Sequence, residues 1–299
     1  MFPGYRHIPK PVRERLKQVP HLRDWVHDVD ILLKHGKLRP QTVELANSPH
    51  RIYIDAEEPR GRAVLRGRGR GQGEPKRVFR RCLALMSPTL VLDIGANYGE
   101  FAFASDYPQN CQVLVVEPNP VLGHLLEQSR RLHPDADRIT VERAAAGARS
   151  EGELVIYIDE EWSGRSSAVR AEGKPVHVPM LAVDEWVAAH QASPARVLFK
   201  VDVEGYEPFV LEGMKKTLAS ADTYAGFVEF NTDFMEMAGV DKANFLDEIA
   251  GLGAVFVFSR KGIQPLDEVR SQVEHKAIAD LFVCSDAALL QHIPLLASG

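Results

Sequence analysis

Three ionisable side chains alternate along one short segment, KVDVEGYE. Lys200, Asp202 and Glu204 lie two residues apart, so they share one side of the chain while the backbone is extended. They follow the apolar run 197–199, which predicts a buried strand. Burial and neighbouring charges shift pKa values, so a carboxylate here could accept a proton from a poorly nucleophilic hydroxyl. The alternative is a lysine that pairs with carboxylates only to hold the end of the strand.

A fourth charged residue, Glu229, ends the apolar run FVEF and could join this cluster. We expect Asp202 or Glu204 to act as the base, while Lys200 orients the substrate or stabilises the carboxylates. Asp202, Glu204 and Glu229 could instead bind a divalent metal ion through their oxygen atoms. Metal-free chemistry is our expectation, and loss of activity on chelation would overturn it.

A glycine-rich turn, VLDIGANYGEFA, follows another apolar strand upstream. The strand ends at Asp93, and the turn then contains Gly95, Asn97 and Gly99. A ligand can approach the backbone closely at such a turn. The dinucleotide fingerprint has glycine where Asn97 and Glu100 stand, and a carboxylate would repel a pyrophosphate. S-adenosylmethionine (SAM) carries a sulfonium cation and no phosphate, so the turn favours SAM over NAD.

Glu117 ends the next strand, in the segment VLVVEPNP. A carboxylate there can accept hydrogen bonds from two ribose hydroxyls. NAD enzymes use the same device, so Glu117 does not discriminate between the two cofactors. The alternative is a solvated residue at a strand end.

Short apolar strands alternate with helical patterns from residue 90 onward. Because these strands lack a polar face, we expect an α/β fold with a doubly wound, mostly parallel, Rossmann-like sheet. Asn119 followed by Pro120 predicts a helix start. The expected strands are 90–94, 112–117, 139–144, 154–158, 196–201, 226–230, 254–258 and 281–284, and the expected helices are 99–105, 119–132, 183–189, 208–218 and 243–252.

At this point the chain resembles the FkbM family of SAM-dependent methyltransferases. The matching segments are VLDIGANYGE, VEPNP, ERAAAG and FKVDVEGYEPFVLEG, of which the last is the most specific. The resemblance covers about residues 74–284. It implies a class I methyltransferase that modifies a hydroxyl, often on a sugar, glycan or secondary metabolite. The reaction would convert SAM into S-adenosylhomocysteine by in-line displacement.

The resemblance also implies a role for individual residues. Asp93, Gly95, Asn97 and Gly99 would cradle the methionine part of SAM, and Glu117 would hold the ribose. Other residues expected at the cofactor are Glu74, Ala96, Pro118, Asn119, Asp202 and, along the adenine, Glu142, Arg143 and Ala144. The family often has Asn at the position of Arg143.

Two polar segments are candidates for binding the acceptor. Residues 60–81 contain eight arginines, one lysine and five glycines, and the glycines oppose a stable helix before about Pro75. We expect a folded loop that attracts an anionic acceptor through Arg66, Arg68 and Arg70. The segment 162–169 could be a lid with Arg165, Ser166 and Ser167 on the substrate, or a plain surface hairpin.

Composition restricts the remaining possibilities. Residues 1–90 hold 19 basic and 9 acidic residues, whereas the rest holds 17 and 32, which suggests an anionic partner near the join. We expect an N-terminal helical and Arg/Gly-rich elaboration over 1–73, including a helix near 24–33 that could mediate a homodimer, and a methyltransferase domain over 74–299. Three scattered cysteines, no apolar run of spanning length and no secretory signal predict a cytoplasmic protein.

We expect no nucleic-acid partner, because the Arg/Gly segment lacks interleaved aromatics. No histidine pair has zinc-ligand spacing. Two other functions stay open. One is an NAD-dependent oxidoreductase, and the other is a catalytically inactive scaffold that keeps the fold.

Overall fold

The computed structural model describes residues 41–69, 73–159, 162–259, 262–275 and 278–292, together with Pro9, Pro11, Val12 and Arg15. The helix expected at 24–33 and the residue Arg70 lie outside this part of the chain. In the described part, no helix is both long and apolar enough to cross a membrane.

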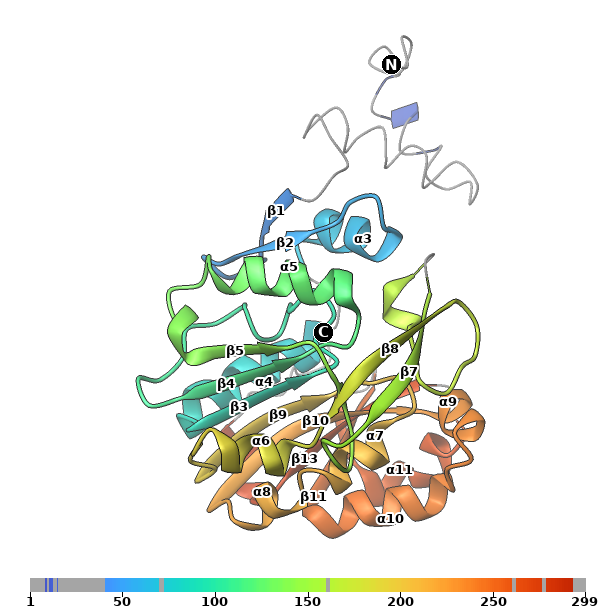
Figure 1. Ribbon diagram of the computed structural model, residues 1–299. Helices are drawn as coiled ribbons and strands as arrows, with labels where there is room; N and C mark the ends of the chain where they lie inside the picture. Colours follow the sequence, from blue (N-terminus) through green and yellow to red (C-terminus); the bar gives the residue numbers. More distant parts are fainter. Residues whose placement is uncertain are drawn as a thin grey trace.

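An eight-stranded sheet forms the centre of the fold (Figure 1). Its strand order is β12-β11-β13-β10-β9-β3-β4-β5, and the neighbours from β10 to β5 are parallel. The chain runs outward from β3 to β5 and then returns to β9, so the order reverses between β3 and β9. Ligands bind at such a switch point, beyond the carboxyl ends of the strands. The strands are β3 (Leu90–Ile94), β4 (Gln112–Val116), β5 (Ile139–Glu142), β9 (Arg196–Val201), β10 (Thr223–Asn231), β11 (Ala254–Ser259), β12 (Gly262–Pro265) and β13 (Ile278–Cys284).

Helices cover both faces of this sheet because the strands are apolar on both sides. All five residues of β3 are buried; Val91 joins the core beneath α4 and α5, whereas Leu92 joins the core beneath the later helices. The expected α/β doubly wound fold is therefore confirmed. The helices are α4 (Gly73–Met86), α5 (Pro120–Arg130), α6 (Val183–Ala189), α7 (Glu207–Glu212), α8 (Lys215–Ala219), α9 (Thr232–Met237), α10 (Lys242–Leu252) and α11 (Leu266–Val273), with 3-10 turns η2 (Ala136–Arg138) and η4 (Ala287–His292).

The described N-terminal residues pack into the same core. β1 (Gln41–Glu44) and β2 (Arg51–Ile54) form an antiparallel hairpin, and the Tyr53 amide donates to Ser129 Oγ of α5 at 2.8 Å. Helix α3 (Pro59–Gly67) follows, with Glu58 accepting from the amides of its first turn. The expectation that glycine opposes a helix before Pro75 is wrong, because this N-cap and the buried Val64 and Leu65 stabilise the helix.

A smaller three-stranded sheet lies over the carboxyl ends of the central strands (Figure 1). It has the order β6-β8-β7, and the short 3-10 turn η3 connects β7 to β8. This insertion separates β5 from α6 in the chain, so it brings residues of the middle of the sequence above the switch point. Its elements are β6 (Ala145–Ala146), β7 (Glu153–Ile158), η3 (Ser163–Arg165) and β8 (Lys174–Leu181).

Two helices expected from the sequence are different in the structure. Residues 99–105 form turns, because Asp93 Oδ2 accepts from the Ala102 amide at 3.0 Å and takes that donor away from a helical bond. The helix expected at 208–218 divides into α7 and α8 around Gly213. A Cβ at Gly213 would lie 2.0 Å from the Gly147 carbonyl, so the chain turns there in close contact with the small sheet.

Candidate active site

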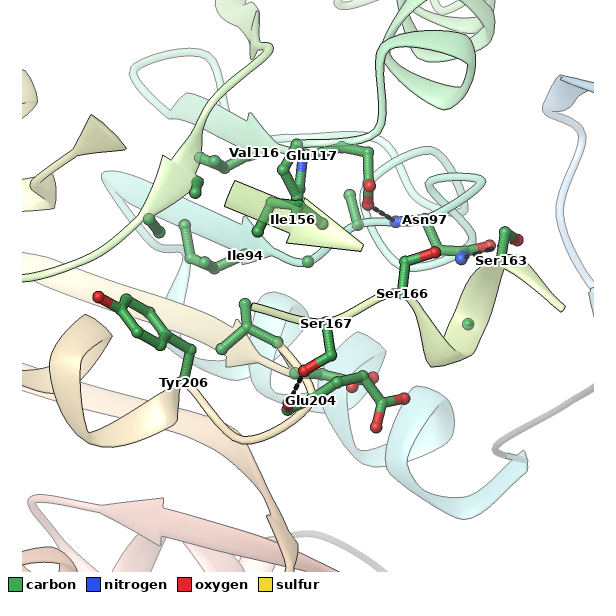
Figure 2. A pocket seen from close by; sticks show the side chains of 18 of the residues that line it. Ile94, Asn97, Val116, Glu117, Ile156, Ser163, Ser166, Ser167, Glu204 and Tyr206 are labelled. Atoms are coloured by element: carbon green, nitrogen blue, oxygen red, sulfur yellow. Dashed lines mark hydrogen bonds between the residues drawn. The ribbon is translucent and has the colours of Figure 1, made fainter. Parts of the chain in front are cut away.

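A cavity of about 230 Å³ lies at the switch point, between the ends of β3, β4, β9 and β10 and the small sheet above them. Figure 2 shows Ile94 and Val116 on the strand side, Ile156 across from them, Tyr206 at one end and Ser163 at the other. The cavity is thus apolar in the middle and polar around it. The expected site residues that line it are Gly95, Ala96, Asn97, Glu117, Pro118, Ser166, Ser167, Lys200, Asp202, Glu204 and Glu229.

The turn after β3 presses against the turn after β9. Gly95 and Asn97 have φ angles of 76° and 51°, in the left-handed region. A Cβ at Gly95 would lie 1.8 Å from the Asp202 carbonyl oxygen, so only glycine permits this approach. Lys200 Nζ donates to the Gly95 carbonyl at 2.8 Å and joins the two strand ends from the other side. The two segments that the sequence singled out therefore form one site.

The amide groups of residues 95–99 all donate to acceptors within the protein. A diphosphate needs free amides of this kind at the start of a helix. This turn offers it none, and no helix begins in the described residues 96–105. The acceptors are Val116 O for Gly95 and Ala96 (2.9 and 3.1 Å), Glu117 Oε2 for Asn97 (2.7 Å), Asn97 Oδ1 for Tyr98 (3.1 Å) and Ala96 O for Gly99 (2.8 Å).

The carboxylate of Glu117 is clamped at the end of β4. Its Oε2 accepts from the Asn97 amide and its Oε1 from the Asn119 amide, at 2.7 and 2.9 Å. Burial raises the pKa of Glu117 to about 7, although these two amides and Lys200 favour the charged form. Each carboxylate oxygen can accept more than one hydrogen bond. Glu117, which lines the cavity, can therefore still accept from a pair of hydroxyls on a ligand.

Asp93 is behind the cavity and does not line it. The side chain is fully buried, and Oδ1 accepts no hydrogen bond from any described residue. Burial raises its pKa, while Lys200, 3.7 Å away, favours the charged form. Lys200 Nζ also lies 3.2 Å from Asp202 Oδ2. Burial alone would lower the pKa of Lys200, but the negative charges of Asp202 and Asp93 outweigh the burial and raise this pKa. Asp93 thus holds Lys200 and the turn from behind, and its contact with the methionine part of a ligand stays a prediction.

Three carboxyl groups gather on the opposite wall. Oxygen atoms of Asp202, Glu204 and Glu229 all lie within 4.8 Å of one another. Burial, together with Asp202 and Glu207, raises the pKa of Glu204 to about 9. Burial, together with Asp202 and Glu204, raises the pKa of Glu229 well above its usual value, and its buried Oε2 has no hydrogen-bond partner in the described part of the chain. The cluster can hold and exchange protons near neutral pH, and its oxygen atoms could also hold a divalent cation.

The backbone at Glu204 is itself unusual. Its φ of 53° is left-handed, which is uncommon for a residue with a side chain. Ser167 Oγ donates to the Glu204 carbonyl at 2.6 Å (Figure 2). The buried carboxylate of Glu207 accepts from the amides of Val203 and Gly205. These bonds hold the Glu204 turn against the segment 162–169, which lies over the cavity and is called the cover below. The sequence analysis gave no role to Glu207, which is the last residue of the segment KVDVEGYE and the first residue of α7.

A second charged group lies on the wall formed by α3. Arg60 lines the cavity and forms an ion pair with Glu100, whose other oxygen is 3.0 Å from Lys76 Nζ. Burial would raise the pKa of Glu100, but Arg60 and Lys76 outweigh it and lower the pKa. The expected repulsion of a diphosphate by Glu100 is therefore not supported, because two cations compensate its charge. Among the described residues, the lining carboxyl groups without a salt bridge are instead Glu117, Glu204 and Glu229.

The cover of the cavity is attached at two points. Glu58, the N-cap of α3, accepts from the Ser163 amide at 2.9 Å and from the Tyr98 hydroxyl at 2.9 Å. Asn97 Nδ2 donates to Ser163 Oγ at 3.3 Å. Ser163 therefore joins η3 both to the N-terminal helix and to the glycine-rich turn. The segment 162–169 is more than a plain surface hairpin, because four of its residues besides Ser166 and Ser167 line the cavity: Trp162, Ser163, Gly164 and Ala168.

Several other expected site residues lie away from the cavity. Glu142 accepts from Trp186 Nε1 at 3.2 Å, Arg143 packs over Gly123, and Asn119 caps α5. Ala144 is buried in the core, Gly99 packs on Phe103, and Glu74 forms an exposed pair with Arg77. Arg66 is exposed on α3, Arg68 is exposed at the C-cap of α3 and pairs with Glu44, and Arg165 is exposed on η3. The lining set thus excludes Glu74, Asp93, Gly99, Asn119, Glu142, Arg143, Ala144, Arg66, Arg68 and Arg165.

Arg66 and Arg68 do not line the cavity for a simple physical reason, and their contact with an acceptor stays a prediction. Helix α3 turns Arg66 and Arg68 toward solvent and Arg60 toward the cavity. The sequence could have shown this only through the helix start at Glu58 and Pro59, because an acidic N-cap followed by proline predicts one. Tyr206, which also lines the cavity, carries no comparable signal.

Comparisons with known proteins agree with this architecture. A family model described as the methyltransferase FkbM domain matches residues 93–255. The chain is 29% identical over 211 residues to the hexuronic acid methyltransferase AglP of Haloferax volcanii, which covers 69% of this chain and 80% of that protein.

Solved structures show weaker similarity. The methyltransferase FkbM from Methylobacillus flagellatus KT is 14% identical with a TM-score of 0.37; the match covers 87% of this chain and 60% of that one. TYW2 of P. horikoshii, in complex with MeSAdo, is 12% identical with a TM-score of 0.42, over 89% of this chain and 84% of that one.

Proposed function

Because the chain belongs to the FkbM methyltransferase family, whose model spans more than half of it, we propose that it transfers a methyl group from SAM to a hydroxyl of a sugar, glycan or secondary metabolite. The observation that carries the choice of cofactor is the turn after β3. Its amides from residue 95 to residue 99 are all satisfied internally, whereas the neighbouring carboxylate of Glu117 keeps acceptor capacity. A cationic nucleoside with a ribose diol suits this arrangement, and a dinucleotide does not.

The residues fit SAM in three respects. Glu117 can accept hydrogen bonds from the ribose hydroxyls. The apolar wall of Ile94, Val116 and Ile156 can contact the adenosine. The carboxyl cluster gives the cavity an acidic side for a sulfonium cation. When bound, SAM would supply a methyl group on a good leaving group, so the protein mainly has to align the acceptor and exclude water.

The chain's own contribution to chemistry is the removal of a proton. A carboxylate of the cluster, Asp202 or Glu204, accepts the proton of the acceptor hydroxyl as the new bond forms. Lys200 holds Asp202 in place at 3.2 Å and fixes the turn through Gly95. The cover at Ser163 and Ser167 shields the site from water. A sugar-type acceptor is supported by the similarity to AglP, a hexuronic acid methyltransferase.

Calorimetric titration tests the cofactor. We expect the full chain to bind SAM and S-adenosylhomocysteine and not NAD, and binding of NAD alone would overturn the proposal. Incubation with SAM labelled in its methyl group and a panel of sugars then tests transfer. A methyl ether on the product survives mild alkali, whereas a methyl ester is hydrolysed, so this treatment distinguishes a hydroxyl from a carboxyl acceptor. Cofactor binding without transfer to any acceptor would favour the inactive scaffold.

A further inference from the structure

Two cationic side chains stand among the described residues that line the cavity, and they differ in how far they are committed. Lys200 already meets the Gly95 carbonyl at 2.8 Å, Asp202 at 3.2 Å and Asp93 at 3.7 Å. Arg60, on α3, has one side-chain partner, Glu100, which its Nη2 contacts. Its Nε and Nη1 donate to no other described residue. Arg60 is therefore the cation with donors left for a ligand.

The surroundings of Arg60 keep its positive charge effective. Glu100 compensates Arg60 only in part, because Lys76 shares the same carboxylate at 3.0 Å. Lys76 is itself fixed by the Gly69 carbonyl at 2.8 Å. Two cations on one buried carboxylate leave one net positive charge at this wall. The other carboxyl groups of the lining offer an anion no positive charge: Glu117, Asp202, Glu204 and Glu229.

The position of Arg60 is also fixed before any ligand binds. Glu58 accepts from the Arg60 amide at 3.0 Å and from the Ser163 amide at 2.9 Å, so the start of α3 is attached to the cover. The Arg60 side chain is 22% exposed, which lets it reach a ligand while its stem packs near Gly164. A preorganised guanidinium loses little entropy when it binds a planar anion with two parallel hydrogen bonds.

We propose that Arg60 forms a carboxylate-binding subsite of this cavity. The subsite rests on the proposed function only for the identity of its ligand. Two ligands of that reaction present a carboxylate: the amino-acid part of SAM, and an acceptor that is a sugar acid. Both use the same fork of donors on Arg60, and they are separable by experiment.

The first arm measures the cofactor side by calorimetry on the full chain. S-adenosylhomocysteine carries the amino-acid carboxylate, and 5′-methylthioadenosine lacks the amino-acid part. If the cofactor is the source, the wild type binds the former at least about tenfold more tightly, and Arg60→Gln reduces that margin about tenfold. Arg131→Gln, an exposed arginine on the far end of α5, is the matched control and keeps the margin.

The second arm measures the acceptor side with methyl β-D-glucuronide and the neutral methyl β-D-glucoside. If the acceptor is the source, the wild type binds the glucuronide more tightly than the glucoside, and Arg60→Gln abolishes this difference in affinity. Arg60→Lys keeps the positive charge but lacks the planar pair of guanidinium donors, and it replaces the glutamine variant if that variant does not fold. We expect it to lose part of the difference in affinity between the two sugars. Margins that stay within about twofold in both arms, in a folded variant, overturn the subsite.

Failure of the proposed function gives a different pattern. If the wild type binds neither adenosine compound but discriminates between the two sugars through Arg60, the subsite stands and the SAM proposal falls. A base-labile methyl ester on the glucuronide would overturn the acceptor source, because the carboxylate would then be the methylated group and not the group held by Arg60.

Discussion

Replacing Glu204 with glutamine should change how the stability of the protein depends on pH. The native pKa of Glu204 is raised from 4.5 to about 9 by burial and by the charges of Asp202 and Glu207. The unfolded chain releases this proton near pH 4.5, whereas the native chain keeps it. The free energy of unfolding of the wild type therefore falls as the pH rises through this window. A glutamine does not titrate, so the variant lacks this part of the fall.

The size of the effect follows from the linkage. One proton held only by the native state lowers the free energy of unfolding by about 1.4 kcal/mol per pH unit. Between pH 5.5 and pH 7.5 the variant should gain up to about 2.7 kcal/mol over the wild type. We expect a gain of at least about 1 kcal/mol, because neighbouring carboxyl groups in the cluster share protons. The similar shapes of the two side chains keep the contact with Asn231 and the left-handed backbone.

Urea denaturation followed by tryptophan fluorescence measures this difference at both pH values. Glu172→Gln removes an exposed carboxylate from the surface and is the control; its difference from the wild type should stay constant within about 0.5 kcal/mol. A Glu204→Gln difference that is equally constant would refute the reasoning. The same variant identifies the base: if Glu204 accepts the proton, wild-type activity rises with pH toward 9, and the variant loses that rise along with most of its rate.

Three further predictions concern neighbouring groups. Lys200→Met should destabilise the protein by about 3–5 kcal/mol at pH 7, because Asp93 and Asp202 lose their counter-charge. The loss should be smaller at pH 5, because burial raises the pKa of Asp93 and favours its uptake of a proton. Urea denaturation measures the loss, with the exposed Lys215→Met as a near-neutral control, and an equally small loss in both variants would contradict the prediction. Glu117→Gln should weaken binding of S-adenosylhomocysteine at least about tenfold in calorimetry. The glutamine places an NH₂ donor against a backbone amide that the carboxylate oxygen now accepts from. An unchanged affinity would remove Glu117 from the cofactor site. Methyl transfer should survive dialysis against EDTA; activity that disappears and returns with Mg²⁺ would instead show that the cluster of Asp202, Glu204 and Glu229 works through a bound cation.

Much of the sheet could be predicted because its signals are local. The runs 90–94 and 196–201 are mostly apolar without strict alternation, and they form β3 and β9 with those bounds. Asn119 and Pro120 begin α5 as expected. A buried strand needs little beyond its own side chains and the length of the run, so neighbouring residues in the sequence carry enough information.

Elements that depend on distant partners were less predictable. Residues 99–105 are not helical, since Asp93 takes one of their amides, and Gly213 divides a helix because Gly147 lies against it. The Asp93 bond crosses the glycine-rich turn to a residue nine positions away, and Gly147 is far from Gly213 in the sequence. The Arg/Gly segment shows the same limit, because α3 is stabilised by the contacts of Val64 and Leu65 with the core.

By itself, the sequence determined the α/β fold, the glycine-rich turn and the acidic residues that end the strands, because each is a pattern of residue types along a short stretch. Only the tertiary structure decided which polar groups remain open to a ligand. Asp93, Glu100 and Glu117 are all acidic residues at or close to a strand end in the sequence, yet Asp93 is sealed in the core and Glu100 is held by Arg60 and Lys76. The availability of a charge depends on its partners in space, and those come from α3, α4 and the cover, far apart in the chain.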